Sequence, residues 1–447
     1  MFRGLGGFIV WLVICGSCAG RPSGPQPLVL SDVTLVDMVS GEARPGLSVL
    51  IAEDRITQVG DAAEVTIPRD TRVIDGAGRF LIPGLWDVHV HLGGYEPGVA
   101  AGPSFIAHGV TGVRDMGSPP DEIVRLVAES RVATPARPRL MAVGPLHQGP
   151  LPFEMPLIRQ VASREDAIGA VTELARLGID FVKVGDSVPP ELFEALASEA
   201  GRRGLGLVGH IPVGVSATDA VEAGQQTIEH FGSARFHGLL LACSTDEEAL
   251  TAVVVEILDA LGRGDDREAE LFEVGLTQRL VRTFSENKAR ALFRTFARSG
   301  TYNVPTLLAV REVWEGQRDG LSEEGRVAAD DVWSLYSTMV RLMQEEGVGL
   351  LACTDLAPDG ALVHDELALL VAAGLTPLQA LRAATSTPAA FFGLSSELGS
   401  IESGQRANLV LLRRNPLVNI ANTKEIDGVV VGGEFLDRAQ LEALTGT

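Results

Sequence analysis

Basic side chains are scarce in this sequence. Lys and Arg together number 37 against 58 Asp and Glu, which gives a formal net charge of −21 at pH 7. A surface this acidic repels phosphate backbones, so the composition argues against nucleic acid as a partner. The same charge disfavours docking of the folded body on anionic lipid.

Cysteine is also scarce, with four residues in a chain of 447. Only Cys18, Cys243 and Cys353 would remain after removal of an N-terminal leader, which is too few for a disulfide framework. No C-x-x-C pair indicates a thiolate metal site, and low-complexity tracts are absent. We therefore expect a globular protein whose length suggests a barrel-sized domain and a smaller one.

Residues 1–19 have the order of a secretory signal peptide. Arg3 supplies a positive charge, and the apolar run of residues 8–15 is too short to span a bilayer. A signal peptidase could cut after Ala19, whereas a lipoprotein peptidase could cut before Cys18 and leave a lipid anchor on that cysteine. We expect an exported protein that is periplasmic, secreted or lipid-anchored to the cell envelope, with a short membrane anchor as the alternative.

Short strand patterns occupy both ends of the chain. Residues 28–78 contain several, separated by turn formers, and residues 398–436 contain a matching set with Gly432-Gly433 as a hairpin turn. Neither set can bury much core alone. We expect the two ends to pair into one small β-sandwich domain, with the rest of the chain inserted between them.

Residues 79–397 alternate strand and helix patterns, which predicts a parallel α/β sheet. Eight strands are expected, the count of a closed (β/α)8 TIM-type barrel. Residues 232–301 are too long for one strand–helix–strand step and are predicted to be an insertion, either a lid or a decorated barrel helix. The predicted strands cover residues 85–92, 112–116, 140–144, 181–185, 206–211, 227–231, 303–308 and 349–355.

Four histidines lie at the ends of predicted strands. His89 and His91 are two apart on one strand, so both point to the same face, where two imidazoles can hold one metal ion. Asp87 shares that face and is expected to orient a histidine ligand without binding the metal itself. His210 and His230 each end a strand, and their separation fits one strand–helix–strand step. Any one of them alone would more often be a core histidine, but the set is more specific.

Lys183 and Asp355 also end predicted strands. A buried lysine lowers its pKa readily, and a neutral amine can react with carbon dioxide to give a carbamate that bridges two metals. A salt-bridged lysine is the plainer alternative. A carboxylate at Asp355 can bind metal and accept a proton from water that the metals activate. Imidazole and carboxylate ligands suit zinc, although manganese, cobalt and iron accept them too.

Together these residues resemble the motifs of the amidohydrolase superfamily, most closely its imidazolonepropionase-like branch with prolidase-type and carboxypeptidase-like members. The resemblance extends from about Leu28 to Leu436 and implies a barrel with a sandwich. The motifs that carry it are residues 83–91 (PGLWDVHVH), residues 109–117, His210, Glu229-His230, Thr354-Asp355 and residues 399–412.

The resemblance assigns a role to each predicted ligand. His89 and His91 would bind a buried metal, and His210 and His230 a more exposed one. Carboxylated Lys183 would bridge the two ions. Asp355 would ligate the first metal, act as general base and later protonate the leaving nitrogen. Relatives of this kind are often homo-oligomers.

Substrate contacts are less well marked by the sequence. Many relatives carry a Gly-Gly-His run where this chain has residues 144–150 (GPLHQGP), so His147 either replaces that histidine or caps a loop. Tyr95 follows the first barrel strand and could reach a substrate carboxylate. Arg114 could do the same, or could form a structural ion pair with the Asp that follows it. His364 is expected in the loop after Asp355.

The leading hypothesis is hydrolysis of the amide bond in small dipeptides or in N-acyl and N-aroyl amino acids, by water activated between two divalent metals. Opening of a cyclic amide or a lactone would use the same ligands. Deamination is a further alternative, although related deaminases typically use one metal without a bridging lysine. A non-catalytic binding lipoprotein has no reason to keep all six groups.

Overall fold

The structure is a computed structural model that describes residues 26–93, 101–130, 134, 136–151, 155–233, 237–317 and 322–446. The predicted leader with Cys18 lies outside the described residues, and so does Tyr95. Among the helices of the described part, none combines the length and apolar character needed to cross a membrane.

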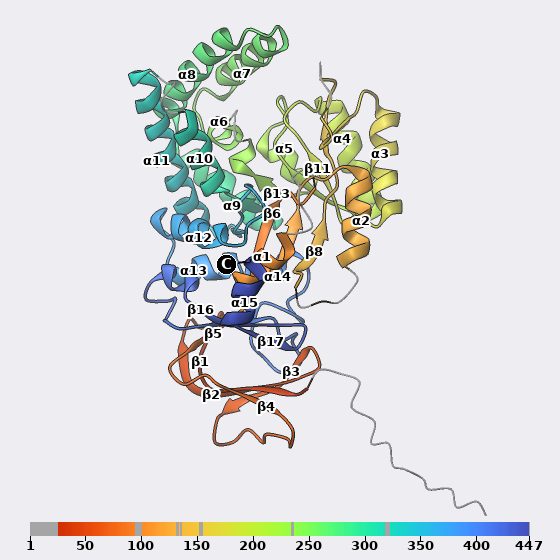
Figure 1. Ribbon diagram of the computed structural model, residues 1–447. Helices are drawn as coiled ribbons and strands as arrows, with labels where there is room; N and C mark the ends of the chain where they lie inside the picture. The colour runs from red at the N-terminus through yellow and green to blue at the C-terminus, as the bar shows by residue number, and fades with distance from the viewer. Residues whose placement is uncertain are drawn as a thin grey trace, which may run out of the picture.

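The two ends of the chain meet in one eight-stranded sheet, seen at the bottom of Figure 1. Strand β15 pairs antiparallel with β5, so the ends pair as the sequence predicted. Leu30, Leu81 and Leu409, from β1, β5 and β15, share one buried core. The strands are β1 (Leu28–Val36), β2 (Ala43–Ala52), β3 (Arg55–Asp61), β4 (Arg72–Asp75), β5 (Phe80–Pro83), β15 (Leu409–Leu412), β16 (Ile426–Val431) and β17 (Glu434–Asp437).

The middle of the chain contains two parallel sheets. Strands β6, β7, β11, β12 and β13 are almost entirely buried, as expected for parallel strands covered on both faces, whereas β8 and β10 are more exposed. The first consists of β6 (Leu85–Val90), β7 (Val110–Asp115) and β8 (Arg139–Ala142); the second of β10 (Ile158–Gln160), β9 (Leu146–Gln148), β11 (Phe181–Val184), β12 (Gly206–Gly209), β13 (Gln225–Glu229) and β14 (Tyr302–Val304).

Backbone hydrogen bonds link the two sheets at both sides. The Asp180 N–H donates to the carbonyl of Ala142, which joins β8 to β11. On the other side, residues 349–355 lie between β14 and β6, because the Leu351 N–H donates to Asn303 and the Val88 N–H donates to Ala352. The result is a mixed α/β fold that is consistent with a TIM-type barrel.

Two predicted strands differ from the structure. Residues 349–355 form only a bridge between Leu350 and Asn303 rather than a full strand. Strand β14 ends at Val304, four residues before the predicted end, because Pro305 has no N–H to donate and Thr306 has a left-handed backbone. Both differences occur at the end of the strands where the polar residues gather.

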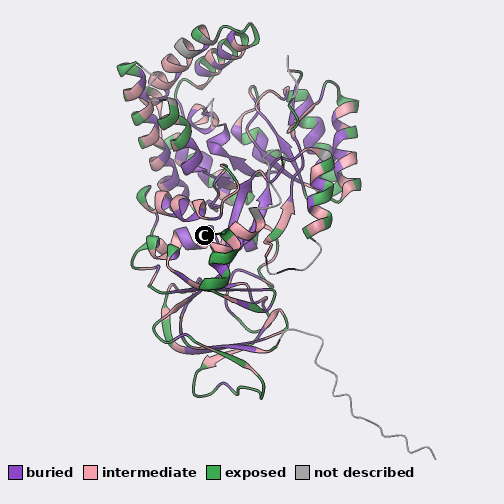
Figure 2. Ribbon diagram, viewed as in Figure 1, coloured by how far each residue is buried: buried purple, intermediate pink, exposed green. Residues whose placement is uncertain are grey.

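Helices cover the parallel sheets, and buried positions gather on the strands and on the helix faces that contact them (Figure 2). The helices outside the predicted insertion are α1 (Ala101–Ala107), α2 (Pro120–Ser130), α3 (Arg164–Leu177), α4 (Pro190–Arg203), α5 (Ala217–Glu222), α10 (Leu307–Gln317), α11 (Glu323–Glu345), α12 (Leu362–Ala372), α13 (Pro377–Ala383), α14 (Ser386–Phe391) and α15 (Arg438–Thr445), with short 3₁₀ turns η1 (His230–Gly232) and η3 (Ile420–Lys424).

The predicted insertion of residues 232–301 has two parts. Helix α9 (Glu286–Ser299) packs against α5 and α11, as a barrel helix would. The part that precedes it consists of α6 (Gly238–Ala242), α7 (Glu247–Gly262) and α8 (Asp266–Thr283). Helices α7 and α8 pair with each other and lie at the end of the molecule opposite the terminal sheet (Figure 1). The inserted element is therefore shorter than the sequence predicted.

The shared core of the terminal sheet generates a stability prediction. Leu81→Ala removes a fully buried side chain on β5, between the two chain ends, and is expected to lower the free energy of unfolding by about 2–5 kcal/mol. Val418→Ala alters a side chain that is 79% exposed and should change the free energy of unfolding by less than about 0.5 kcal/mol. Urea unfolding followed by circular dichroism measures both. Equal midpoints would contradict a core shared by the two ends.

Candidate metal centre

Two histidines at the end of β6 meet the carboxylate of Asp355. Strand β6 is buried along its whole length and carries His89, and His91 directly follows its last residue. The Nε2 atoms of these residues lie 3.2 Å and 3.0 Å from Oδ1 of Asp355. The three side chains can therefore present one ligand atom each to a single metal ion.

His230 contacts the other oxygen of the same carboxylate, and His210 lies beside His230. The Nε2 atom of His230 is 3.5 Å from Oδ2 of Asp355, and its ring centroid is 4.6 Å from that of His89. The rings of His210 and His230 are 5.3 Å apart. The four imidazoles predicted from strand ends thus form one continuous group around Asp355.

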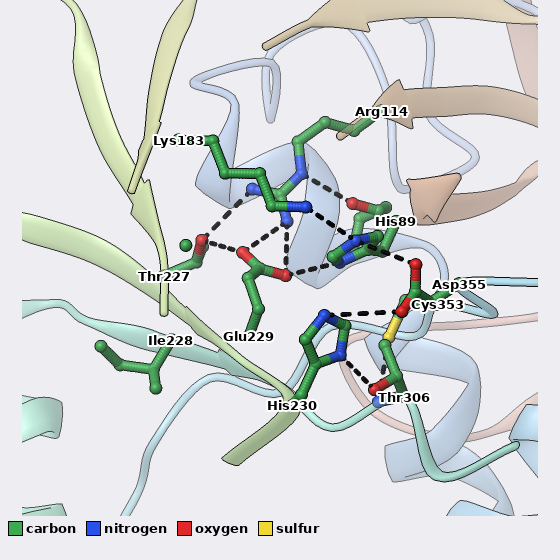
Figure 3. A network of polar contacts seen from close by, with 12 residues as sticks. His89, Arg114, Lys183, Thr227, Ile228, Glu229, His230, Thr306, Cys353 and Asp355 are labelled. Carbon is green, nitrogen blue, oxygen red and sulfur yellow. Dashed lines mark hydrogen bonds and ion pairs between the residues drawn. The ribbon is translucent and has the colours of Figure 1, made fainter. Parts of the chain in front are cut away.

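Lys183 lies on β11 and points into this group (Figure 3). Its Nζ atom is 3.3 Å from Nε2 of His89, and the side chain is buried. Burial lowers the pKa of Lys183, which favours the neutral amine, although the nearby carboxylates of Asp355 and Glu229 oppose this effect. All six predicted ligands are therefore brought to one end of the parallel strands.

The histidine rings are oriented as metal ligands usually are. Each uses Nδ1 for a contact with the protein, which leaves Nε2 as the free ligand atom. Such a set of neutral imidazoles with one carboxylate fits divalent zinc or a similar ion. The Nδ1 contacts are His89 to Glu229 (2.9 Å), His91 to the carbonyl of Gly117 (3.1 Å), His210 to Asp186 (2.9 Å) and His230 to Thr306 (2.6 Å).

Burial and mutual charge set the protonation of the centre. Burial lowers the pKa of His89 to about 4, so that its ring is neutral at pH 7. Burial also lowers the pKa of His230 well below its usual range. For Asp355, burial acts to raise the pKa, but the surrounding imidazoles outweigh it and hold the pKa well below the ordinary value. The rings of His89 and His230 are thus neutral and the carboxylate of Asp355 is ionised, and these are the forms that bind metal.

Glu229 belongs to a motif of the resemblance, but the sequence assigned it no role. It lies on β13 and is fully buried; one carboxylate oxygen accepts from His89, and the group is paired with the guanidinium of Arg114 at 3.0 Å. Thr227 also donates to it. Burial would raise the pKa of Glu229, but Arg114 outweighs this and keeps the carboxylate ionised. The available signal was its position two residues after Thr227, on the inward face of the same strand.

Arg114 differs from its predicted role as a substrate contact. Its side chain is fully buried, and its Nε atom donates to the carbonyl of Val88 at 2.6 Å. Its remaining nitrogens contact Thr227 and Glu229. The alternative of a structural ion pair is closer to the structure, but the partner is Glu229 rather than the adjacent Asp115.

The other predicted contacts lie in different surroundings. His364 lies in α12 rather than in a loop, and both ring nitrogens are engaged, with the hydroxyl of Thr423 and the carbonyl of His108. His364 therefore contributes to the packing of α12 against η3. His147 lies on β9 and is buried; its Nδ1 contacts the carbonyl of Lys183 at 3.0 Å, and no partner is found for Nε2 among the described residues.

Asp87 supports the centre in a different way from the one expected. Its carboxylate accepts from the hydroxyl and the backbone N–H of Thr354, at 2.7 Å and 3.1 Å, and from the backbone N–H of His89. It fixes the backbone that carries Asp355 instead of contacting an imidazole ring. Burial raises the pKa of Asp87 to about 7.

Three residues of the centre have a left-handed backbone. The φ angles of His230, Thr306 and Asp355 are 50°, 48° and 51°. Non-glycine residues rarely adopt this conformation, which costs of order 1–3 kcal/mol and is concentrated at functional sites. Here it turns the chain at the strand ends, so that Glu229 and His230, which are adjacent in sequence, both contribute to the centre.

A model of the amidohydrolase family matches residues 80–436, and the chain belongs to that family. Members of this family generally use divalent metals, in agreement with the group formed by His89, His91 and Asp355. Family membership was predicted from the motifs around these residues and is confirmed.

The chain is similar to proteins with different named activities. Adenine deaminase from Ruegeria pomeroyi is 27% identical over 88% of this chain and 55% of its own length, and the chain spans about half the length of the curated relatives it matches. A Xaa-Pro dipeptidase with bound methionine has a TM-score of 0.67 at 20% identity, covering 92% of this chain and 100% of that one. A bottromycin amidohydrolase has a TM-score of 0.69 at 23% identity, covering 94% and 89%. At these identities the structural likeness shows the fold alone.

The buried pair of Arg114 and Glu229 generates a prediction. Glu229→Gln leaves Arg114 buried without its charge partner and weakens the support of His89, so metal affinity should fall by about 10–100-fold. Glu345→Gln, which removes exposed ion pairs on α11, is the matched control and should bind metal as the unmodified protein does.

Metal content after dialysis against a graded series of chelator concentrations measures this effect without any assay of activity. Identical retention curves for the two variants would show that Glu229 does not support the centre. Thermal unfolding of the metal-free proteins identifies any general loss of stability.

Proposed function

We propose that this chain is a metal-dependent hydrolase that cleaves the amide bond of small dipeptides or of N-acyl and N-aroyl amino acids. The observation that carries the proposal is the convergence of the Nε2 atoms of His89, His91 and His230 on the carboxylate of Asp355, with the amine of Lys183 beside His89 and the ring of His210 beside that of His230. The proposal includes a closed (β/α)8 barrel and a β-sandwich formed by the terminal sheet.

Two divalent ions, with zinc as the first choice, would be held by these side chains. His89, His91 and Asp355 form the compact group suited to one ion, and His210 with His230 would hold the second. Lys183, carboxylated on Nζ, would bridge them. Ions bound there would lower the pKa of a water molecule and polarise the scissile carbonyl.

Asp355 is the proposed general base and acid. Its carboxylate would accept a proton from the attacking water and later donate it to the leaving nitrogen, so that no charged amide nitrogen has to depart. The hydrogen bonds from Thr354 to Asp87 hold the backbone in front of Asp355. The left-handed backbone at Asp355 directs its carboxylate toward the histidines.

The relatives support two substrate classes. The solved structures named as a Xaa-Pro dipeptidase and an amidohydrolase are covered almost completely and favour amides. The curated sequences named as adenine deaminase favour removal of an amino group from a purine base, which is the second candidate. The position of Lys183 beside His89 favours the first, because a bridging lysine implies two metals. Opening of a cyclic amide or a lactone would use the same groups.

The setting of the enzyme is also a proposal. The leader-like sequence of residues 1–19 supports export, with or without a lipid anchor on Cys18. Relatives of this kind are often homo-oligomers, which supports a homo-oligomer here. The expected partner is a small-molecule amide or dipeptide.

Amino-acid release from a panel of dipeptides and N-acyl or N-aroyl amino acids tests the function. The zinc-loaded protein should release amino acid, and a chelator should abolish the release. Asp355→Asn should lower kcat by about 10²–10⁴-fold, whereas Asp365→Asn, at an exposed ion pair with Lys424, should not. Adenine, a cyclic amide and a lactone complete the panel. If the protein released ammonia from adenine and cleaved no amide, deamination would replace the proposed function. If it turned over only the cyclic amide or the lactone, ring opening would replace it.

The bridge at Lys183 has a separate test. Lys183→Ala should lower metal content after dialysis, because the carbamate is lost, and a short carboxylic acid such as propionate should restore part of it. Lys424→Ala, at an exposed lysine, is the matched control. Elemental analysis measures metal per chain. Full occupancy of Lys183→Ala without added acid would show that no lysine bridge exists.

A further inference from the structure

A cavity of about 890 Å³ lies between the inserted helices and the segment that follows β12. One wall is formed by residues 211–217, which connect β12 to α5, and the other by α6 and the first half of α7. Its size falls within the range of small-molecule binding sites. Figure 1 shows α5, α6 and α7 on the side of the strands away from the terminal sheet.

The cavity adjoins the metal centre through the backbone that carries His210. Ile211, the next residue, lines the cavity, and its N–H donates to the carbonyl of Gly232 at 2.8 Å. Val213, also in the wall, donates to the carbonyl of Asp186, whose carboxylate contacts His210. None of the six predicted ligands lines the cavity. If a substrate spans the centre and this cavity, the cavity would hold a group attached to the reacting amide and not the amide itself.

The chemistry of the walls selects the kind of group. Apolar side chains form much of the lining, and no Lys, Arg or His is found among the described residues that line it. Asp246, Glu247 and Glu248 lie at the start of α7. Asp246 is paired with Arg279 at 3.9 Å and Glu247 with Lys288 at 2.9 Å, so Glu248 is the carboxylate of the three without a partner among the described residues. The apolar lining residues include Val213, Val215, Leu241, Ala242 and Val254.

These walls distinguish the two ends of the proposed substrate. The leaving amino acid carries a carboxylate, which the acidic start of α7 repels and for which the cavity has no cation. The acyl side has no such charge, and an aromatic or branched acyl group would be favoured by removal of its apolar surface from water.

We propose that this cavity binds the acyl portion of the substrate, and that it favours bulky apolar acyl groups such as aroyl groups. The assignment rests on the proposed amide hydrolysis. It places the acyl group between α7 and the segment after His210, with the carboxylate end directed away from the cavity. The inserted helices then determine substrate preference.

Filling the cavity tests the assignment. Ala252 lies on α7, is exposed and lines the cavity, so Ala252→Trp should occupy its space. Val255, on the same helix and 45% exposed, does not line it, and Val255→Trp is the matched control. The substrates are an N-(2-naphthoyl) and an N-acetyl derivative of one amino acid, assayed with zinc-loaded protein.

Ala252→Trp should lower kcat/KM for the naphthoyl substrate by at least about 10-fold, the scale on which an apolar pocket discriminates by size. It should change kcat/KM for the acetyl substrate by less than about 3-fold, and Val255→Trp should alter neither. An equal loss on both substrates, or no loss on either, would overturn the assignment. Thermal unfolding verifies that both variants are folded.

Binding separates this inference from the proposed function. If the unmodified protein cleaves neither compound, amide hydrolysis of this class fails, and equilibrium binding of the fluorescent naphthoyl compound is then measured with all three proteins. Binding weakened only in Ala252→Trp would retain the cavity as a site for apolar aromatic groups. Equal binding by all three, or none by the unmodified protein, would overturn it.

Discussion

The buried ion pair of Arg114 and Glu229 is the interaction on which the arrangement of the centre depends. A single charge in this interior would be very unfavourable, and each member is tolerated because the other is present. Arg114 also donates to the carbonyl of Val88 on β6, so the pair connects the first strand of the parallel sheets to β13. Glu229 then orients His89 through Nδ1. The orientation of His89 is thereby fixed by an ion pair that is fully buried.

Much of the centre was predictable from strand periodicity. His89 and His91 were found because residues two apart share a face of a strand, and His210, His230, Lys183 and Asp355 because each ends a strand pattern. The paired chain ends were predictable for a related reason: neither set of short strands has enough apolar surface to fold alone. These inferences depend on local spacing, which the sequence contains directly.

The remaining features depend on tertiary contacts and on backbone turns. Arg114 was assigned by its neighbour Asp115, whereas its partner Glu229 is 115 residues away. Glu229 was part of a motif but received no role, since adjacent residues on a strand point to opposite faces and the left-handed backbone that lets both Glu229 and His230 reach the centre is not visible in the sequence. His364 was expected in a loop because nothing before it marks the start of α12, where no side-chain cap is formed.

The charge balance of the proposed centre depends on the charge state of Lys183. Glu229 is already neutralised by Arg114, and Asp355 is the carboxylate among the six groups. Two divalent cations bring four positive charges into this interior, and a protonated lysine beside His89 would add a fifth. A carbamate on Lys183 supplies a negative charge at that position instead. A centre with one metal ion holds two fewer positive charges and requires less negative charge to balance them. The charge state of Lys183 therefore distinguishes a two-metal amide hydrolase from a one-metal deaminase.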